Sequence, residues 1–183
     1  ILLVIISFQI FCQVWYMINL ALNLLDEWPM KSQAVRIVSH KASDQNEIYV
    51  NEIGEIYTAD NERIGQIRDE ITALEDYEIW IFFENSKKVQ RFYRPSSTSN
   101  TILLTERCDQ TCIMCSQPPK NKDYLHFDLY RQALKFINFE TEIGISGGEP
   151  SLFKNELFEF LSVLSKEQPY IKFQILTNGQ HFK

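Results

Sequence analysis

Residues 105–119 read TERCDQTCIMCSQPP and place three of the chain's four cysteines, Cys108, Cys112 and Cys115, within eight positions of one another. The fourth, Cys12, lies far away in the sequence. Disulfide bonds explain this cluster poorly, because three is an odd number, the spacing is tight and no convincing secretory signal precedes it. Three closely spaced thiolates instead indicate a metal centre.

Two kinds of metal centre fit this spacing. A structural zinc ion needs four ligands, and the nearest downstream histidine, His126, lies eleven residues after Cys115. An iron–sulfur cluster uses the same thiolates, and with only three of them one iron keeps an open position, as catalytic metal sites do. Both interpretations stay open from the spacing alone.

Three segments in this half of the chain read as β-strands: 101–107 (TILLTER), 142–146 (EIGIS) and 171–176 (IKFQIL). The segments between them have the apolar periodicity of helices, so strands and helices alternate. Such alternation predicts parallel strands with right-handed crossovers. The expected fold class of this half is therefore α/β.

Two helices are expected between these strands. The first spans 128–139 and begins near Asp128, a residue type that favours N-caps. The second spans 154–168. One face of each helix is apolar and would pack on the sheet: Leu129, Ala133, Phe136 and Ile137 in the first, and Leu157, Phe158, Leu161 and Leu164 in the second.

An unusual sequence follows each expected strand. The cysteines follow the first strand, Gly147-Gly148-Glu149-Pro150 follows the second, and Thr177-Asn178-Gly179 follows the third. Binding sites of parallel sheets lie at the carboxyl ends of the strands. The three sequences would therefore meet at one end of one sheet.

In this order, CDQTCIMC (108–115), GISGGEP (144–150) and ILTNG (175–179) resemble the radical S-adenosylmethionine (SAM) enzymes, whose signature is CxxxCxxC followed by a GGE-type turn. The resemblance implies that the three cysteines hold a [4Fe–4S] cluster and that the amino and carboxylate groups of SAM chelate its open iron. The cofactors then carry the chemistry, and the protein orients them.

The resemblance also implies a SAM site. Gly147 and Gly148 would let the backbone approach SAM closely, and Glu149 would offset its ammonium charge. Met114 stands where the family often has an aromatic residue and would pack near the adenine. A plain strand-to-helix turn is the alternative interpretation of the glycines. Six residues are thus expected to bind SAM: Gly147, Gly148, Glu149, Met114, Thr177 and Asn178.

The catalytic core of the family is similar to a partial (β/α)6 barrel. Residues 101–183 would supply three of its strands, so this part is expected to be the N-terminal portion of a truncated radical SAM core. The strands that usually contact the ribose and adenine would lie beyond Lys183.

A narrower resemblance lies in CIMCSQPPK (112–120), IGISGGEPSLFK (143–154) and ILTNGQHF (175–182), which are similar to the C-type maturases of the His-Xaa-Ser system. It implies modification of a peptide or protein substrate, with a His-Xaa-Ser repeat protein, a second maturase and an external electron donor as expected partners. Two alternatives stay open: a radical SAM enzyme acting on a small molecule, and a non-catalytic module that binds zinc or an iron–sulfur cluster.

Residues 31–94 are expected to form a small α+β or β-rich domain, because short alternating runs are separated by turn residues. The polar residues 95–100 read as a linker to the second domain. Strands are expected in four places in the first domain: 48–50, 55–58, 78–84 and 89–93.

Residues 1–30 form a hydrophobic segment. Residues 1–25 contain no charged side chain, and a segment of this length is long enough for a membrane-spanning helix. One interpretation is a membrane anchor. The others are a start placed too early, with Met17 or Met30 as the real first residue, and a simple buried segment. The expected location is the cytoplasm, with membrane association through 1–25 as the alternative.

The composition is that of a globular protein, with 45% hydrophobic and 23% charged residues. The net charge of −6 offers no basic surface of the kind that binds phosphate backbones, so nucleic acid is not an expected partner. His181 lies just after the third strand, near the presumed site, and is expected to be a surface residue.

Overall fold

The computed structural model describes residues 19–24, 32–38, 42–67, 74–84, 88–113, 115 and 119–182. The chain divides into two compact units. We call residues 17–98 together with 132–136 the barrel unit, and the remainder, which includes 99–131 and 137–183, the sheet unit.

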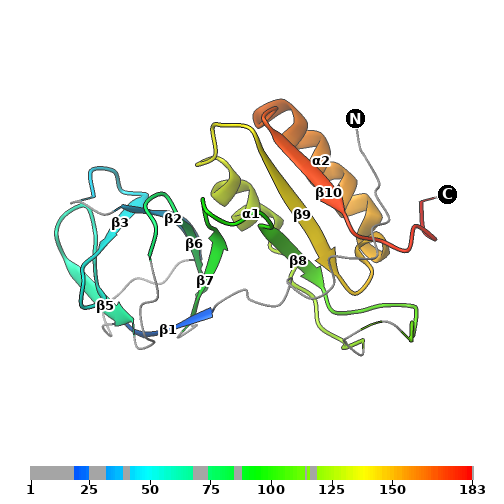
Figure 1. Cartoon of the computed structure of the whole chain (residues 1–183), viewed down its shortest axis with the longest axis horizontal. Helices are drawn as coiled ribbons and strands as arrows, with labels where there is room; N and C mark the ends of the chain where they lie inside the picture. The colour runs from blue at the N-terminus through cyan, green and yellow to red at the C-terminus, as the bar shows by residue number, and fades with distance from the viewer. Residues whose placement is uncertain are drawn as a thin grey trace. The chain divides into compact units, whose positions relative to one another are not determined.

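The barrel unit contains seven strands: β1 (Asn19–Leu24), β2 (Gln33–Val38), β3 (Glu47–Val50), β4 (Glu55–Tyr57), β5 (Arg63–Ile67), β6 (Ile79–Phe82) and β7 (Lys88–Tyr93). Their order in the sheet is β1-β5-β4-β3-β2-β6-β7 (Figure 1). β1 also pairs with β7, which closes the sheet into a barrel. All pairs are antiparallel except β2 with β3.

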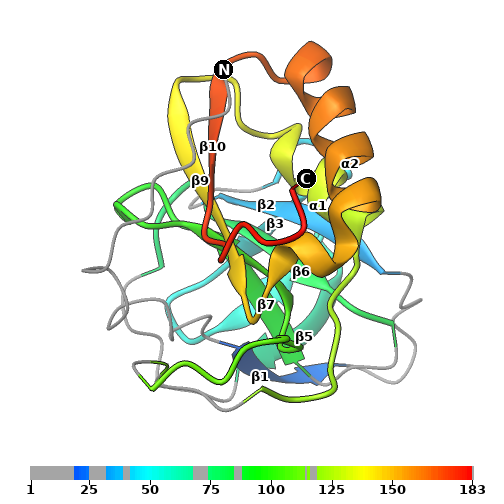
Figure 2. The same cartoon turned by 90° about the vertical axis from the view of Figure 1, so that its right-hand side faces the viewer.

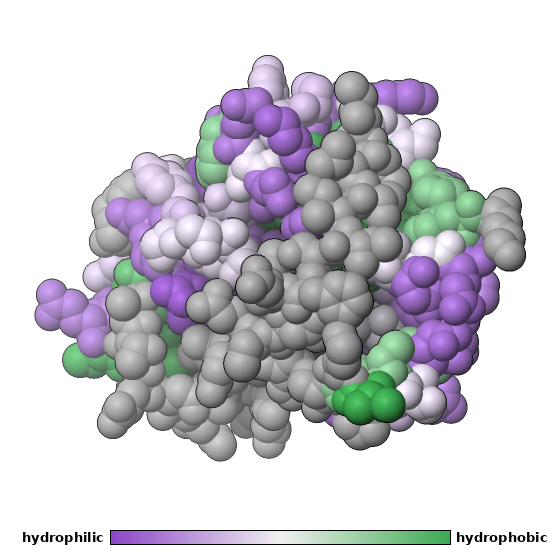
Figure 3. Space-filling model, turned by 45° about the vertical axis from the view of Figure 1, so that its right-hand side comes forward, coloured by the Kyte–Doolittle hydropathy of each residue, from purple (hydrophilic) through white to green (hydrophobic). Residues whose placement is uncertain are grey.

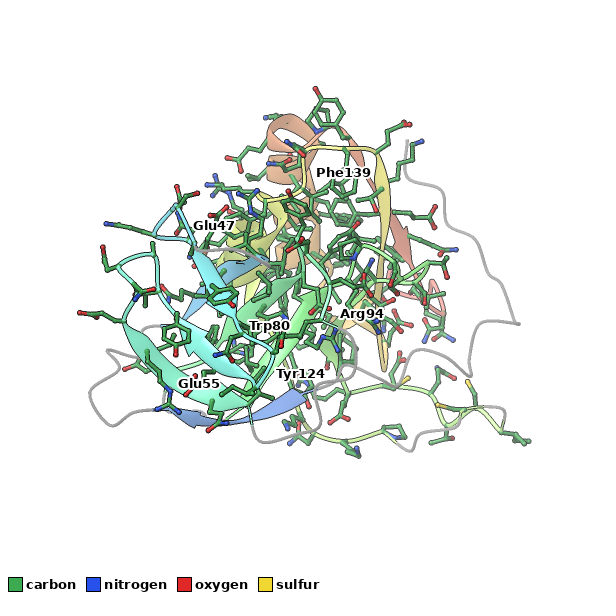
Figure 4. The ribbon with its side chains drawn as sticks, turned by 60° about the vertical axis from the view of Figure 1, so that its left-hand side comes forward. Glu47, Glu55, Trp80, Arg94, Tyr124 and Phe139 are labelled. Atoms are coloured by element: carbon green, nitrogen blue, oxygen red, sulfur yellow. The ribbon has the colours of Figure 1, made fainter. Side chains whose placement is uncertain are left out.

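The strands of this unit enclose an apolar core. All four residues of β6 are buried, and Trp80 is 0% exposed. Trp80 packs in one cluster with Val35, Ile48 and Ile56, among the side chains that the strands surround (Figure 4). Burial of each such side chain contributes roughly 1.5–3 kcal/mol to folding.

A buried ion pair lies beside this core. The Glu78 carboxylate is 0% exposed and accepts hydrogen bonds from Arg91 Nε (2.9 Å) and Trp80 Nε1 (2.8 Å) at Oε2. Arg91 Nη2 contacts the other oxygen, Oε1, so the pair is bidentate. Inside the barrel unit, a buried carboxylate and a buried guanidinium thus balance each other's charge and form hydrogen bonds with each other.

Strands lie at all four places expected in residues 31–94, as β3, β4, β6 and β7. The sequence pattern did not indicate β2 and β5. β2 has two buried residues for each half-buried one, in place of strict alternation, and β5 carries Gly65 and Gln66 in its middle. Neither strand therefore has the apolar alternation that marks a half-buried strand.

The 95–100 segment, expected as a linker, is hydrogen-bonded at both ends. At its start, the Ser96 N–H and Arg94 Nη2 donate to the Glu75 carboxylate, at 2.9 and 2.8 Å. At its end, Asn100 is buried and its carbonyl accepts a hydrogen bond from the Gly144 N–H (2.8 Å).

The sheet unit contains three parallel strands and two α-helices, which confirms the expected alternation. The elements are β8 (Thr101–Thr105), α1 (Phe127–Leu134), β9 (Thr141–Gly147), a 3-10 helix (Pro150–Phe153), α2 (Lys154–Glu167) and β10 (Ile171–Ile175). The strand order is β10-β9-β8. Both helices lie on one face of this sheet, as Figures 1 and 2 show.

The helices differ from expectation in three details. α1 begins at Phe127, so Asp128 lies in its first turn, not at the N-cap, and it ends at Leu134, five residues before the expected end. On α2, Phe158 is 45% exposed, whereas Phe160 is buried. The buried positions 157, 160, 161 and 164 follow the i, i+3, i+4, i+7 spacing of one helix face, and position 158 lies off that face.

The expected anchor at residues 1–25 lies mostly outside the described residues. Its described part, Asn19–Leu24, is strand β1 and not helix. In the described part of the chain, no helix is both long enough and apolar enough to span a bilayer. On the face seen in Figure 3, the coloured residues are largely hydrophilic, and hydrophobic ones are exposed as separate small areas.

Candidate functional site

The candidate site lies where the three parallel strands end. The arrowheads of β8, β9 and β10 point to the same end of the sheet (Figure 1). We call residues 107–119, which follow β8, the cysteine loop, and residues 177–182, which follow β10, the β10 loop. The 147–150 turn follows β9. The three segments expected to meet therefore start from one end of one sheet.

The base of the cysteine loop is closed by backbone hydrogen bonds. Residues 120–124 run back beside residues 104–106. The Glu106 N–H donates to the Lys122 carbonyl (2.7 Å), and the Lys120 N–H donates to the Glu106 carbonyl (2.9 Å). The chain thus leaves and re-enters the sheet edge at the same place, which limits the positions that the cysteines between can reach.

Side chains reinforce this base. Thr105 is fully buried, and its hydroxyl donates to Asp123 Oδ1 (2.6 Å). The same oxygen accepts a hydrogen bond from Arg107 Nε (2.9 Å), and the Arg107 guanidinium lies 4.8 Å from the centre of the Phe153 ring. The sequence analysis missed Asp123, because nothing in its local pattern indicates a partner eighteen residues upstream.

The three cysteines lie on the loop: Cys108 is half-buried, and Cys112 and Cys115 are exposed. The Cys115 N–H donates to the Cys112 carbonyl (3.0 Å), so a turn links these two. Among the residues described, no three His, Cys, Asp or Glu side chains are grouped closely enough to hold a metal ion. Met114, the expected adenine contact, lies outside the described residues.

Cys108 has an environment that disfavours a bare thiolate. Burial raises the pKa of the Cys108 thiol, the Gln110 N–H (3.4 Å from Sγ) opposes this, and the negative charges of Asp109 and Glu149 raise it further. A cation bound near the sulfur would favour the thiolate, because ligand deprotonation is coupled to metal binding.

Packing in the sheet explains the two glycines of the β9 turn. Gly147 has a φ of +144°, and a Cβ there would lie 2.1 Å from the Thr105 carbonyl oxygen. A Cβ on Gly148 would lie 2.1 Å from the Arg107 carbonyl oxygen. The turn therefore packs directly on the backbone at the end of β8. The contact of these glycines with SAM stays a prediction.

Glu149 holds the end of β10 to the end of β9. Its side chain is 1% exposed, and Oε1 accepts hydrogen bonds from the Ser151 N–H (2.8 Å) and the Thr177 hydroxyl (2.5 Å). Oε2 accepts one from the Asn178 N–H (2.6 Å). The structure thus joins Glu149 to two other expected SAM-site residues. These three hydrogen bonds all come from neutral donors within the chain.

The β10 loop also binds the cysteine loop. Asp109 Oδ1 accepts a hydrogen bond from Asn178 Nδ2 (3.0 Å), and Asp109 Oδ2 lies 2.8 Å from His181 Nε2. Gln110 Nε2 donates to Gln180 Oε1 (3.2 Å). The His181 hydrogen bond is the main cause that lowers the pKa of Asp109. The His181 side chain is 37% exposed, so it lies at the surface as expected, and its contact with Asp109 joins residues that are 72 positions apart in sequence.

Comparisons with known proteins add no assignment: neither a family model nor a curated protein nor a solved structure matches the chain.

Proposed function

We propose that the chain is a radical SAM enzyme in which Cys108, Cys112 and Cys115 hold a [4Fe–4S] cluster at the carboxyl end of the parallel sheet. One observation carries the proposal. The three segments that bear the sequence signature follow β8, β9 and β10, and side-chain hydrogen bonds join them to one another. A signature spread over 70 residues is thereby gathered at one strand end, where α/β proteins place their sites.

The cysteine loop fits an iron–sulfur cluster as a ligand set. It carries three cysteines, two of them exposed, and hydrogen bonds fix the base of the loop. Binding would draw the thiols together, because metal binding and local folding are coupled. When bound, the cluster would supply the electron that cleaves SAM.

Residues at the ends of β9 and β10 would receive SAM. Gly147 is exposed and Gly148 is half-buried, so their backbone is open to a ligand on the side away from β8. Glu149 holds Thr177 and Asn178 in place, and its carboxylate would offset the ammonium charge of SAM. These residues would bind and orient SAM beside the cysteine loop.

The substrate proposal is a peptide or protein. It rests on the sequence resemblance of residues 112–120, 143–154 and 175–182 to the C-type maturases of the His-Xaa-Ser system. A His-Xaa-Ser repeat protein would be the substrate, with a second maturase as partner and an external electron donor.

Metal analysis tests the ligand set. After anaerobic reconstitution with iron and sulfide, we expect about four irons and four sulfides per chain and a brown protein. Cys112→Ala should lose most of this iron, whereas Cys12→Ala, which removes the thiol outside the loop, should retain it. A colourless protein that keeps zinc in preference to iron would contradict the proposal and favour a zinc-binding module.

A further inference from the structure

We propose that Asp109, Asn178 and His181 form a clasp that positions the cysteine loop before any metal binds. The contacts of the clasp are seen in the structure and do not depend on the proposed function. Only the purpose of the clasp, which is to position metal ligands, rests on the proposed function. Asn178 and His181 come from the β10 loop, and Asp109 follows the first cysteine.

The clasp provides the cysteine loop with a second attachment. The first is the base, where residues 120–124 pair with 104–106. The second is Asp109, whose two carboxylate oxygens are each bound by a different side chain of the β10 loop. A loop held only at its base samples many conformations, and a second attachment reduces the entropy that ligand binding must remove.

The β10 loop is itself held firmly enough to serve as an anchor. The Asn178 N–H is bound by the buried Glu149 carboxylate, and the His181 carbonyl accepts a hydrogen bond from Lys154 Nζ (2.9 Å) at the start of α2. Phe182 packs against Phe158, with ring centres 5.5 Å apart. These contacts link the clasp to β9 and to α2.

The clasp also explains why Cys108 is more protected than the other cysteines. Cys108 precedes Asp109 directly and is half-buried, whereas Cys112 and Cys115 lie farther from the clasp and are exposed. Opening of the clasp should therefore expose Cys108 and leave the reactivity of Cys112 almost unchanged.

Alkylation of the metal-free, reduced protein by iodoacetamide, followed by mass spectrometry for each cysteine, tests this directly. In His181→Ala we expect Cys108 to react about three to ten times faster than in the wild type, with Cys112 within twofold. In His181→Gln, whose amide can still donate to Asp109, the wild-type rate should largely return. The charge of Asp109 is kept in both variants.

Arg131→Ala is the matched control. It breaks the Arg131–Glu167 ion pair, which lies in the same unit and is about as exposed as the clasp, with side chains 40% and 32% exposed against 37% and 29%. Cys108 should react in this control as in the wild type. If His181→Ala fails to fold by circular dichroism, Gln180→Ala, which removes the adjacent 3.2 Å bond to Gln110, takes its place.

Iron release from the reconstituted protein to a chelator gives a second readout. His181→Ala should lose iron several times faster than wild type, and His181→Gln should restore the slow rate. Equal Cys108 alkylation in wild type, His181→Ala and Arg131→Ala, or no rescue by His181→Gln, would overturn the clasp. A chain that binds no iron would overturn the proposed function, while the alkylation rates alone would still decide the clasp.

Discussion

The barrel unit and the sheet unit each bury a carboxylate almost completely, but different kinds of hydrogen-bond donor surround it in the two units. Glu78, in the barrel unit, is 0% exposed and pairs with the Arg91 guanidinium. Glu149, in the sheet unit, is 1% exposed, and the hydrogen bonds to it come from neutral groups, the Thr177 hydroxyl and two backbone N–H groups. The first arrangement pairs the carboxylate with a cation, whereas the second surrounds it with neutral donors.

This difference separates a structural carboxylate from a functional candidate. A buried ion pair is complete by itself and has nothing left to bind. A buried carboxylate without a cation is costly, and such sites are found where a ligand supplies the missing charge. The ammonium group of SAM would supply it at Glu149.

Removal of Glu78 should have the largest effect on stability. Glu78→Ala leaves the Arg91 guanidinium buried without its partner, so we expect the free energy of unfolding to fall by about 3–5 kcal/mol. Urea unfolding followed by circular dichroism measures this. The double variant Glu78→Leu/Arg91→Met should recover most of the loss, and a double variant as unstable as the single one would contradict the ion-pair account.

A side chain at Gly147 should disturb the sheet unit almost as much. In Gly147→Ala, the new Cβ would meet the Thr105 carbonyl oxygen, and the φ of +144° disfavours alanine, so we expect a loss of about 3 kcal/mol. Gly179→Ala is the matched control, because its φ is also positive (+73°) but no atom lies within 4 Å of a new Cβ. Its expected cost is about 1 kcal/mol. Equal losses in urea unfolding would show that packing on β8 is unimportant.

Neutralising Glu149 should cost less stability than removing Glu78. Glu149→Gln keeps the size of the side chain but turns one acceptor into a donor that faces the Thr177 hydroxyl or the Asn178 N–H, so we expect a loss of about 1–3 kcal/mol. Because a negative charge near Cys108 is removed, the pKa of that thiol should fall. The pH dependence of its alkylation rate measures this shift, and an unchanged profile would contradict the electrostatic link.

Acid should weaken the barrel unit through Glu47 and Glu75. For Glu47, burial alone would raise the pKa, but hydrogen bonds from Arg36 and Ser43 outweigh it and lower the pKa to about 2. Hydrogen bonds from Ser96 are the main cause that lowers the pKa of Glu75 to about 2. The ordinary carboxyl pKa is 4.5, so this stabilisation is complete above that pH.

The same stabilisation should be lost progressively as the pH falls from about 4.5 to about 2. The urea midpoint of the barrel unit should therefore drop across this range. Glu75→Gln should show a smaller drop, and Glu62→Gln, at an exposed position, should behave as the wild type. A urea midpoint that does not change over this range would contradict the two pKa values.

The sequence predicted local elements far better than contacts between distant residues. The strands and helices of the sheet unit follow from apolar periodicity within 5 to 15 residues, which is why β8, β9, β10 and α2 lie close to their expected positions, whereas α1 ends five residues early. β2 and β5 were missed because the closed barrel, and not their own alternation, determines their burial.

For the candidate site too, local motifs were predicted from the sequence and contacts between distant residues were not. Local motifs, their places after the strands and their resemblance to the radical SAM enzymes indicated the cysteines, the glycine turn and Thr177-Asn178. The partners of Asp109 and Thr105 could not be predicted, because each contact joins residues that only the folded sheet brings together: Asp109 with His181, and Thr105 with Asp123. No pattern within one window of sequence contains both members of such a pair.

The central claim is that the cysteines hold a cluster whose open iron binds SAM. Electron paramagnetic resonance of the reduced, reconstituted protein, recorded with and without SAM, tests it most directly. We predict a [4Fe–4S] signal that changes when SAM is added and that is absent from Cys112→Ala. A cluster signal that is the same with and without SAM, or no signal at all, would contradict the claim.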